Sequence, residues 1–403
     1  MNAPILIIGA GQAGLQIAES LRAEGFDGRI LLVGDENLPP YQRPPLSKAW
    51  LAGETADDRL FFRGAEALAA KRIELVTGRR AVAIDPAAKK VRFEDGGEQA
   101  YAGLALATGC RPRRPDLPGA SLEGTCVLRD IPEAHDLSRR LDAAENVVIV
   151  GGGFIGLEVA AAARKRGKKV TLVEAQERLM ARAVTPGISA FFADLHRAHG
   201  ATLLFSQQVA GFAGEGSVSG VTLASGATLP ADLVVLGIGA HVNDELASAA
   251  GVFCARGIVI DDCSRTSHEG IVAAGDCAIR RRADGSMLRL ESVQAAVEQA
   301  KAAAAALMGR EKPFVATPWF WSDQYDCKLQ IAGLSEGADL SVKRRTAEKA
   351  FSLFCYREGR LIAVESINRP GEHMLARRLL DAGLSPAPQQ AADPACDLKA
   401  MLK

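Results

Sequence analysis

The sequence predicts an α/β protein that contains one kind of unit twice, followed by a smaller domain. Two stretches, which begin at Pro4 and at Asn146, each read as an apolar strand, a G-x-G-x-x-G turn, a helix and a second strand. From Lys312 onward the pattern changes to short strands. The spacing of the two copies supports two separate α/β domains, and the later strands with a final helix support a small α+β domain.

The second copy, residues 146–174, shows what such a unit binds. Its first strand is apolar and β-branched, which suits a strand buried on both faces. Three glycines follow: Gly151, Gly153 and Gly156. The first allows the tight turn, the second lets a pyrophosphate approach the backbone, and the third lets the helix lie close to the strand. The helix N-terminus, with Phe154 and Ile155, then directs N–H groups and partial positive charge at the phosphates.

An acid, Glu174, ends the second strand of this copy. It is placed to accept both ribose hydroxyls of an adenosine, and it would repel a 2′-phosphate. The site should therefore prefer NADH to NADPH. Arg182 could reach the cofactor phosphates, although an exposed arginine near a helix end is as often merely solvated.

The first copy predicts a strand over Pro4–Ile8, a helix over Leu15–Ala23 and a strand over Ile30–Val33. Its turn glycines are Gly9, Gly11 and Gly14, and its terminal acid is either Asp35 or Glu36. Two dinucleotide sites imply two dinucleotides. FAD and NADH are the economical pair, because a reduced nicotinamide can reduce a flavin.

A proline-rich loop follows the first copy. Its prolines bar regular structure up to Leu46, and a helix can begin near Ser47 with the serine as its cap. Arg43 and Lys48 on this loop are candidates for a wall of the flavin site, and the alternative is a solvated basic loop.

The remaining elements suggest the domain boundaries. Between the loop and Leu307 we expect a hairpin over Ala81–Asp95, strands over Leu104–Arg111 and Leu233–Gly239, and a helix over Val293–Leu307. In the C-terminal region we expect strands over Leu329–Leu334 and Leu340–Arg345, a hairpin of Phe351–Tyr356 with Leu361–Ile367, and a helix that contains Met374 and Leu380. The strand that ends at Gly239 leads back to the first domain. We therefore expect a discontinuous first domain (1–110 and 240–315), a second domain (111–239) and a C-terminal domain (316–403).

Composition excludes several classes of partner. Lys plus Arg equals Asp plus Glu at 48 each, so no overall charge favours nucleic acid or an anionic membrane. No leader-like or long apolar stretch is present, which indicates a cytoplasmic protein without a membrane partner. The eight cysteines lie no closer than nine residues apart, so neither a C-x-x-C dithiol nor a metal-binding spacing occurs. Any redox centre must therefore be a bound cofactor.

Four motifs, in this order, resemble the two-dinucleotide flavoproteins of the disulfide-reductase type. They are the two G-x-G-x-x-G turns, A-T-G at Ala107–Gly109 and V-A-A-G-D at Val272–Asp276. Narrower motifs are similar to the NADH-dependent ferredoxin reductases of bacterial cytochrome P450 and Rieske oxygenase systems. These motifs are RPPLSK at 43–48, GGGFIGLE at 151–158, LESV at 290–293 and PWFWSDQY at 318–325. The resemblance implies a glutathione reductase-like fold.

The resemblance also implies site residues. On the FAD side they are Ala13, Asp35, Arg43, Lys48, Ala81, Val82, Thr108, Gly109, Arg129, Gly275, Asp276, Ser292 and Val293. On the NADH side they are Glu158, Glu174 and Gly239, together with the second glycine turn. Lys48 and Glu158, paired across two domains, would position the nicotinamide ring. The helix that starts near Ser292 would direct its N-terminal dipole at the pyrimidine end of the flavin.

Two tryptophans, Trp319 and Trp321, precede the C-terminal strands. We expect them to face opposite ways, so that at most one meets the flavin, and we assign that role to Trp321. The alternative is that both pack in the core or at a domain seam.

The resemblance implies an enzyme that takes a hydride from NADH onto FAD and passes single electrons to a [2Fe–2S] ferredoxin, which feeds a P450 or a Rieske oxygenase. An acidic ferredoxin would dock on basic residues at the seam of the FAD and C-terminal domains, and the alternative is that these residues are solvated. The candidates are Arg280, Arg281, Arg282, Arg289, Lys343, Arg344 and Arg345.

Two other functions remain open. One is an NADH oxidase, peroxidase or CoA-disulfide reductase of the same fold, although the loop from Leu38 to Lys48 has no redox cysteine. The other is a flavoprotein similar to apoptosis-inducing factor, with a binding role on DNA, against which the zero net charge argues.

Overall fold

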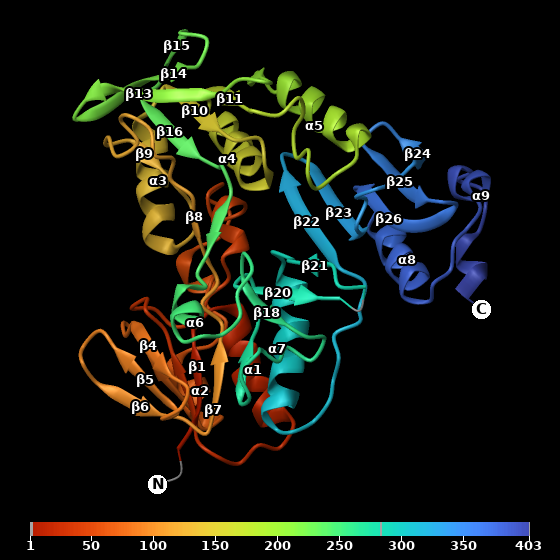
Figure 1. Ribbon diagram of the computed structural model, residues 1–403. Coiled ribbons are helices and arrows are strands. Elements are labelled where there is room, and N and C mark those ends of the chain that lie inside the picture. Colours follow the sequence, from red (N-terminus) through yellow and green to blue (C-terminus); the bar gives the residue numbers. More distant parts are fainter. Residues whose placement is uncertain (1–2, 283, 403) are drawn as a thin grey trace. The chain divides into compact units, whose positions relative to one another are not determined.

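The computed structural model describes residues 3–282 and 284–402, which form two compact units (Figure 1). Unit 1 contains the N-terminal segment up to Gln42, Asp57–Arg111 and His241–Ala316. Unit 2 contains Arg43–Ala56, Pro112–Ala240 and the C-terminal segment from Thr317. The proline-rich loop therefore groups with the second glycine turn. The three-domain division proposed from the sequence stays a prediction.

Unit 1 is built on a five-stranded parallel sheet in the order β19–β7–β1–β2–β3. The strands are β19 (Ile271–Ala273), β7 (Gly103–Leu106), β1 (Ile5–Ile8), β2 (Ile30–Val33) and β3 (Ile73–Val76). Every residue of β1, β2 and β7 is buried, as expected of parallel strands covered on both faces. Because the strands are parallel, their carboxyl ends meet at one edge of the sheet.

Helices α1 (Gln12–Ala23) and α7 (Val293–Leu307) lie side by side on one face of this sheet (Figure 1). Alanines such as Ala18 and Ala300 are fully buried there, and small side chains let the two helices approach closely. The other face is covered by the antiparallel sheet of β4 (Ala81–Asp85), β5 (Lys90–Phe93) and β6 (Glu98–Ala100). The helix predicted over residues 293–307 and the hairpin predicted over residues 81–95 are confirmed.

The described part of unit 1 also contains two short helices, one 3-10 turn and three short strands. They are α2 (Ala65–Ala70), α6 (Glu245–Ala249), η2 (Asp57–Arg59), β18 (Ile258–Ile260), β20 (Ala278–Arg281) and β21 (Met287–Leu288). Two further strands, β8 (Cys110–Pro112) and β17 (Ala240–Val242), occur where the chain changes from one unit to the other.

Unit 2 contains a second five-stranded parallel sheet, in the order β12–β11–β10–β16–β9. The strands are β12 (Thr202–Leu204), β11 (Lys169–Val173), β10 (Asn146–Val150), β16 (Leu233–Leu236) and β9 (Thr125–Cys126). Its main helices are α3 (Ile131–Ala143), α4 (Phe154–Lys165) and α5 (Pro186–Ala198), and a small antiparallel sheet is formed by β13 (Val209–Glu215), β14 (Ser217–Leu223) and β15 (Thr228–Pro230).

The C-terminal part of unit 2 is a five-stranded antiparallel sheet in the order β22–β23–β26–β25–β24. The strands are β22 (Trp319–Gln324), β23 (Cys327–Gly333), β24 (Leu340–Ala347), β25 (Ala350–Arg357) and β26 (Arg360–Ile367). Alternation along β25 turns Phe354 and Tyr356 toward α8 (Pro370–Asp381) and turns Phe351 toward Phe191 of α5, with ring centroids 5.3 Å apart. Two short helices follow, α9 (Pro388–Ala392) and η3 (Leu398–Leu402). The predicted fold class, two dinucleotide-binding α/β domains and an α+β domain, is confirmed.

The proline-rich loop differs from the prediction. It forms the 3-10 turn η1 (Pro44–Ser47), and no α-helix begins at Ser47. The Ser47 hydroxyl donates a hydrogen bond to a carboxylate of another segment, at 2.5 Å, and so caps no helix. Within residues 3–282 and 284–402, no helix is long and apolar enough to cross a bilayer.

Candidate functional site

The first glycine turn joins β1 to α1 at the carboxyl edge of the unit 1 sheet. Gly9 has φ +108°, and a Cβ there would lie 2.1 Å from the carbonyl oxygen of Ala107. A Cβ on Gly14 would lie 1.8 Å from the Gly9 oxygen, so both positions require glycine for the fold itself. A Cβ on Gly11 would meet nothing within 4 Å. No contact within the fold requires glycine at position 11, and the open space beside it would let a ligand approach the backbone.

Helix α1 begins in a way that suits an anion. Its N-cap residue, Gly11, provides no side-chain cap, and no acidic residue occurs in its first turn. By contrast, Asp130 caps α3 and Thr185 caps α5 with their side chains. The first N–H groups of α1 thus lack the side-chain oxygen that satisfies them elsewhere, and they fit the pyrophosphate of a dinucleotide.

Other predicted FAD residues gather at the same edge of unit 1. Thr108 and Asn243 exchange two hydrogen bonds, of 2.6 and 2.9 Å, which fix the loop after β7. Gly275 has φ +83°, and a Cβ on it would lie 3.0 Å from the Cβ of Ala13, so the V-A-A-G-D motif packs directly on α1. Asp276 accepts a hydrogen bond from the Cys110 thiol at 3.4 Å. Three motifs that are distant in sequence therefore meet at one edge.

Several other candidates of unit 1 have measurable environments. Ser292 caps α7 by accepting a hydrogen bond from the Ala295 N–H at 3.1 Å. Asp35 is exposed, whereas Glu36 accepts a hydrogen bond from the Tyr41 hydroxyl at 2.5 Å, so Asp35 is the better placed for a ribose. Ala81 and the exposed Val82 begin β4, Gly109 follows Thr108, and Val293 begins α7. Their contacts with FAD stay predictions.

The second glycine turn repeats the first turn. Gly151 has φ +105°, and a Cβ there would lie 2.4 Å from the Gly237 oxygen. A Cβ on Gly156 would lie 2.2 Å from the Gly151 oxygen, whereas a Cβ on Gly153 would have its nearest neighbour at 4.0 Å. Helix α4 again begins without a side-chain cap and without an acid in its first turn. The second turn fits a second pyrophosphate for the same reasons.

Glu174 lies at the carboxyl end of β11, beside this turn. Its Oε2 accepts from the Gly152 N–H at 2.6 Å and its Oε1 accepts from the Gln176 N–H at 2.7 Å. These bonds hold the carboxylate in place and leave further lone pairs for ribose hydroxyls. Arg178, which could otherwise neutralise a 2′-phosphate, donates instead to the carbonyls of Ala181 and Val184.

Two other residues predicted to bind NADH, Arg182 and Gly239, lie on loops of unit 2. Arg182 is exposed on the loop between β11 and α5, where a solvated role is as open as a phosphate contact. Gly239, which follows β16, has φ +102° and so requires glycine for its backbone.

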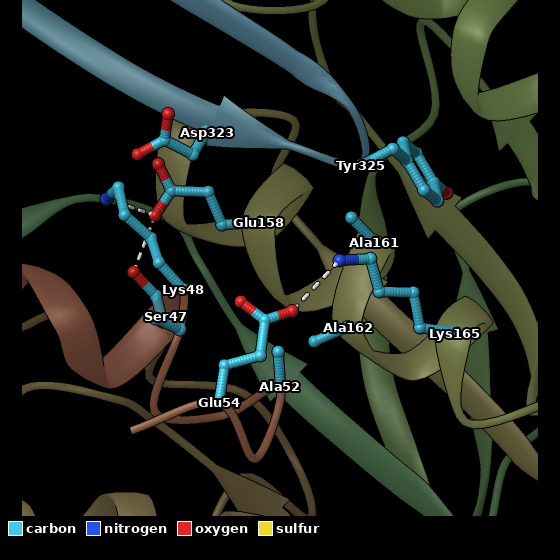
Figure 2. Close-up of a pocket in the computed structure, with 11 residues that line it drawn as sticks. Ser47, Lys48, Ala52, Glu54, Glu158, Ala161, Ala162, Lys165, Asp323 and Tyr325 are labelled. Atoms are coloured by element: carbon cyan, nitrogen blue, oxygen red, sulfur yellow. Dashed lines mark hydrogen bonds and ion pairs between the residues drawn. The ribbon is translucent and has the colours of Figure 1, made fainter. Parts of the chain in front are cut away.

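Glu158 is the centre of a polar cluster in unit 2 (Figure 2). It lies on α4, only 2% exposed, and its Oε2 accepts from Lys48 Nζ at 2.8 Å and from Ser47 Oγ at 2.5 Å. Its Oε1 accepts from Ser322 Oγ, on β22, at 2.6 Å. The carboxylate thus joins the proline-rich loop, α4 and the C-terminal sheet. The Lys48–Glu158 pair that the sequence suggested is present, although both residues belong to unit 2.

Sequence reasoning assigned Ser47 only the role of a helix cap and assigned no role to Ser322. Both belong to motifs quoted above, RPPLSK and PWFWSDQY, which was the available signal. A cavity of about 180 Å³ opens beside the cluster and extends past Glu54 and Lys165 to Tyr325. It is lined by Ser47, Lys48, Ala49, Ala52, Glu54, Glu158, Ala161, Ala162, Lys165, Asp323 and Tyr325. Water therefore has room to reach the Lys48–Glu158 pair from this side.

The expectation for the two tryptophans was wrong. Trp319 and Trp321 are two residues apart on β22, and residues i and i+2 of a strand share a face. Their ring centroids lie 5.7 Å apart, with the planes tilted by 33°. Phe320, between them, packs on Phe154 of α4 with centroids 4.6 Å apart. Trp321 remains a candidate, and its neighbour Trp319 is equally placed by the strand.

Arg344 was wrongly placed among the docking residues. It is only 8% exposed, pairs with Glu372 at 3.1 Å, and donates to several backbone carbonyls between Gln390 and Cys396. Its strand neighbours Lys343 and Arg345 are exposed, because alternate residues of β24 face opposite ways. In unit 1, Arg281 is exposed, Arg280 stacks on Phe314, and Arg289 pairs with Glu291; Arg282 is half-buried.

The arginines on the proline-rich loop and before α3 belong to unit 2. Arg43 donates from Nη1 to the Arg129 carbonyl at 3.0 Å, which ties the loop to the segment that precedes α3. Their predicted contact with FAD, like that of Lys48, stays a prediction.

The cysteines are free thiols, and five of them have a raised pKa. All eight are free, and six of them are buried. Burial raises the pKa of Cys126, Cys254 and Cys327 to about 11, and it also raises the pKa of Cys277 and Cys355. Thiols of this kind are poor nucleophiles. A protein with two dinucleotide turns and such thiols is an oxidoreductase that works through bound cofactors.

Comparison with known proteins defines the family. Residues 3–300 match the pyridine nucleotide-disulphide oxidoreductase family model, and residues 319–402 match the reductase C-terminal model. Rhodocoxin reductase of Rhodococcus erythropolis is 46% identical over 98% of this chain and 93% of its own length. The chain therefore belongs to the pyridine nucleotide-disulphide oxidoreductase family, in the group of the ferredoxin reductases.

Two solved structures show how closely the fold agrees. The ferredoxin reductase for the CYP199A2 system from Rhodopseudomonas palustris has a TM-score of 0.97 at 45% identity, with 100% of both chains covered. The covalent putidaredoxin reductase–putidaredoxin complex contains a chain with a TM-score of 0.96 at 40% identity, with 100% of this chain and 98% of that chain covered. The resemblance inferred from the motifs is confirmed.

Proposed function

We propose that the protein is an FAD-containing reductase that oxidises NADH and passes the electrons singly to a [2Fe–2S] ferredoxin. That ferredoxin in turn supplies a cytochrome P450 or a Rieske oxygenase. The observation that carries the proposal is the pair of glycine turns, each of which opens a helix without a side-chain cap and has open space beside its middle glycine for a ligand to approach. The names of the relatives, which include a ferredoxin reductase and a covalent complex of putidaredoxin reductase with putidaredoxin, support the choice of acceptor.

The residues of the chain divide the work of binding. The turn at Gly9–Gly14 and the Asp276 loop would hold FAD in unit 1, and the turn at Gly151–Gly156 with Glu174 would hold NADH in unit 2. FAD, when bound, supplies the conversion of a two-electron hydride into single electrons. Glu158 would orient the nicotinamide amide group, and Lys48 would hold the Glu158 carboxylate in place. No residue has to act as a nucleophile.

Disulfide or peroxide chemistry is the main rival. Relatives of the same fold that carry out such chemistry rely on a reactive cysteine, whereas five thiols here have raised pKa values and the proline-rich loop carries none. The free thiols also suit a reducing compartment, and we place the enzyme in the cytoplasm. A primary role on DNA has no support in the balanced charge.

The experiment that separates these functions is thiol alkylation. The purified protein should be yellow, should bleach with NADH, and should keep NADH-to-ferricyanide turnover after every accessible thiol is alkylated. If turnover is lost in proportion to the modification of one cysteine, that result would favour disulfide or peroxide chemistry at that cysteine. A small and a large alkylating reagent, compared side by side, separate chemical need from steric blockage.

A further inference from the structure

A buried chain of hydrogen bonds leads from Tyr325 to the carboxylate of Glu158. We propose that two residues of this chain, His196 and Gln324, are positioning residues: acting through Ser322, they hold the Glu158 carboxylate in the orientation in which it meets Lys48. The inference rests on the proposed function, in which Glu158 faces the nicotinamide of NADH. The inference adds that residues on α5 and β22, outside the dinucleotide motifs, determine the orientation of Glu158.

Each link of the chain is within hydrogen-bonding distance. The Tyr325 hydroxyl lies 3.3 Å from His196 Nδ1, and His196 Nε2 lies 2.9 Å from Gln324 Oε1. Gln324 Nε2 donates to Ser322 Oγ at 3.2 Å. Ser322 Oγ donates to Glu158 Oε1 at 2.6 Å. The chain thus ends on the carboxylate oxygen that Lys48 does not occupy.

One arrangement of hydrogens satisfies every link. A carboxylate only accepts, so Ser322 must donate to Glu158 and its oxygen must accept from the Gln324 amide NH₂. The Gln324 carbonyl must then accept from His196 Nε2–H, which leaves Nδ1 of a neutral imidazole to accept from the Tyr325 hydroxyl. Every donor therefore points along the chain toward Glu158, and bonds aligned in this way polarise one another.

The middle of the chain is shielded from water, whereas Tyr325 at its outer end is half-buried. His196 and Ser322 are 0% exposed and Gln324 is 1% exposed. Burial lowers the pKa of His196 to about 4 and raises that of Tyr325 to about 12. Near neutral pH both side chains are therefore in the protonation states that the arrangement requires. Without competing water, each group is restricted to the partner that the fold supplies.

The fold explains why these residues meet. Alternation on β22 turns Ser322 and Gln324 to the same face, which packs against α4, and α5 supplies His196. Tyr325 follows in the turn after β22. Its φ of +55° is a left-handed backbone conformation that residues other than glycine rarely adopt. Tyr325 and His199 also stack with ring centroids 3.7 Å apart, which fixes the outer end. The chain therefore begins from a restrained residue.

The chain orients Glu158 and does not conduct protons. Its middle member is an amide, which cannot pass a proton on without changing its covalent form, whereas it can fix the direction of its neighbours. Lys48 and Ser47 hold one carboxylate oxygen, and Ser322 holds the other. Removal of the Ser322 contact would free the carboxylate to rotate and would carry Lys48 with it. Small displacements of such a group lower the rate strongly.

The kinetic test uses Gln324→Leu and Ser322→Ala, with Ser352→Ala as the matched control. Ser352 is also 0% exposed, lies in the same C-terminal sheet, and donates to a buried carboxylate, Glu372, at 2.6 Å. With ferricyanide as acceptor, we expect kcat for NADH to fall about tenfold in both test variants, with KM changed less than about threefold. The control should lose thermal stability and keep kcat. Equal kcat in the control and the folded test variants would overturn the proposal.

A second measurement does not depend on turnover. Histidine-selective ¹⁵N labelling reports the protonation of each ring nitrogen, and in the wild-type protein His196 should show Nε2–H and an accepting Nδ1. Glu158→Gln should shift the His196 signals, because the end of the donor chain changes, while Glu372→Gln should not. If Glu158→Gln leaves them unmoved, the chain is not coupled. A protein that oxidises no NADH would refute the proposed function and leave this result interpretable.

Discussion

At the scale of a single residue, we expect Glu174 to decide the choice of nicotinamide cofactor. Its carboxylate is held by two backbone N–H groups, and Arg178 is occupied with loop carbonyls, so negative charge dominates the place of a 2′-phosphate. Glu174→Gln keeps an acceptor for the Gly152 N–H and removes the charge. We expect the preference for NADH over NADPH, measured as the ratio of kcat/KM values, to fall about tenfold, or ~1.4 kcal/mol.

The control for this prediction is Glu177→Ala. Glu177 is an exposed acid three residues along the same loop, so its removal changes the net charge equally. The preference should stay as in the unmodified protein. Equal loss in both variants would mean that general charge, and not the Glu174 site, selects the cofactor.

The sequence showed the glycines clearly and the serines hardly at all. Gly14 and Gly156 are required by contacts within their own strand–turn–helix units, and Gly9 and Gly151 have a positive φ in the same G-x-G-x-x-G pattern, so the local pattern reveals all four. Ser47 and Ser322 matter because both reach Glu158, from positions that lie more than a hundred residues away from it in the chain. Contacts at such separation follow from the tertiary fold and leave no periodic trace.

At the scale of elements, β24 shows how one strand divides basic residues between two roles. The side chain of Arg344 faces inward, pairs with Glu372, and binds carbonyls of the segment after α9, whereas Lys343 and Arg345 face solvent. A charge run in the sequence hides this division, because the direction of each side chain depends on the strand register. The prediction of Arg344 as a docking residue failed for this reason.

The stability of variants should reflect that division. Arg344→Met leaves Glu372 with less compensation and the tail carbonyls without a donor, so we expect a loss of about 3–5 kcal/mol in the free energy of unfolding. Arg345→Met, on the exposed side, should change stability by less than about 0.5 kcal/mol. Denaturant titration of the two variants measures the difference. Similar midpoints would contradict the inward role of Arg344.

The expectation that Trp319 and Trp321 face opposite ways was wrong, because side chains two residues apart on a strand lie on the same face. Long elements were predicted well, because α7 and the hairpin β4–β5 have continuous patterns. The expected helix at Ser47 failed because the turn around the prolines, and the hydrogen bond to Glu158, took precedence over a local capping signal. Local sequence patterns thus predicted the regular helices and strands. They did not predict residues whose side chains bind a segment distant in the sequence.

At the scale of the whole molecule, two buried histidines predict how stability depends on pH. Burial lowers the pKa of His196 and of His373 to about 4, from an unfolded value near 6.5. Between about pH 4 and pH 6.5, these two histidines are protonated in the unfolded chain and neutral in the folded chain. Stability is therefore fully present above about pH 6.5 and is lost as the pH falls toward 4, by at most about 3 kcal/mol for each histidine.

Histidine replacements test this account. His196→Gln should flatten the fall of the unfolding free energy between pH 6.5 and 4, because glutamine keeps a donor near the position of Nε2 and cannot be protonated there. His241, which is exposed, provides the control, and His241→Gln should leave the pH profile unchanged. An unaltered profile in His196→Gln would show that other groups cause the acid sensitivity.

The fold class was predicted correctly from the sequence. The grouping of the chain segments into two units differs from the grouping that the sequence suggested. The two parallel sheets and the C-terminal antiparallel sheet follow from patterns that repeat along the sequence. The grouping of Arg43–Ala56 with unit 2 follows from contacts such as Lys48–Glu158 and a hydrogen bond from Arg166 to the Leu51 carbonyl. The family resemblance suggested the Lys48–Glu158 pair, whereas nothing in the sequence of the loop predicts its contact with Arg166.

The most direct test of the central claim is anaerobic mixing of the purified holoprotein with NADH and a [2Fe–2S] ferredoxin, followed by absorbance of the flavin and of the cluster. We predict that each NADH reduces two ferredoxin molecules, because a hydride carries two electrons and each cluster accepts one. NADPH should support the reaction poorly, and ferredoxin reduction should slow as ionic strength rises. NADH consumption in air that yields hydrogen peroxide, with no cluster reduced under anaerobic conditions, would contradict the account.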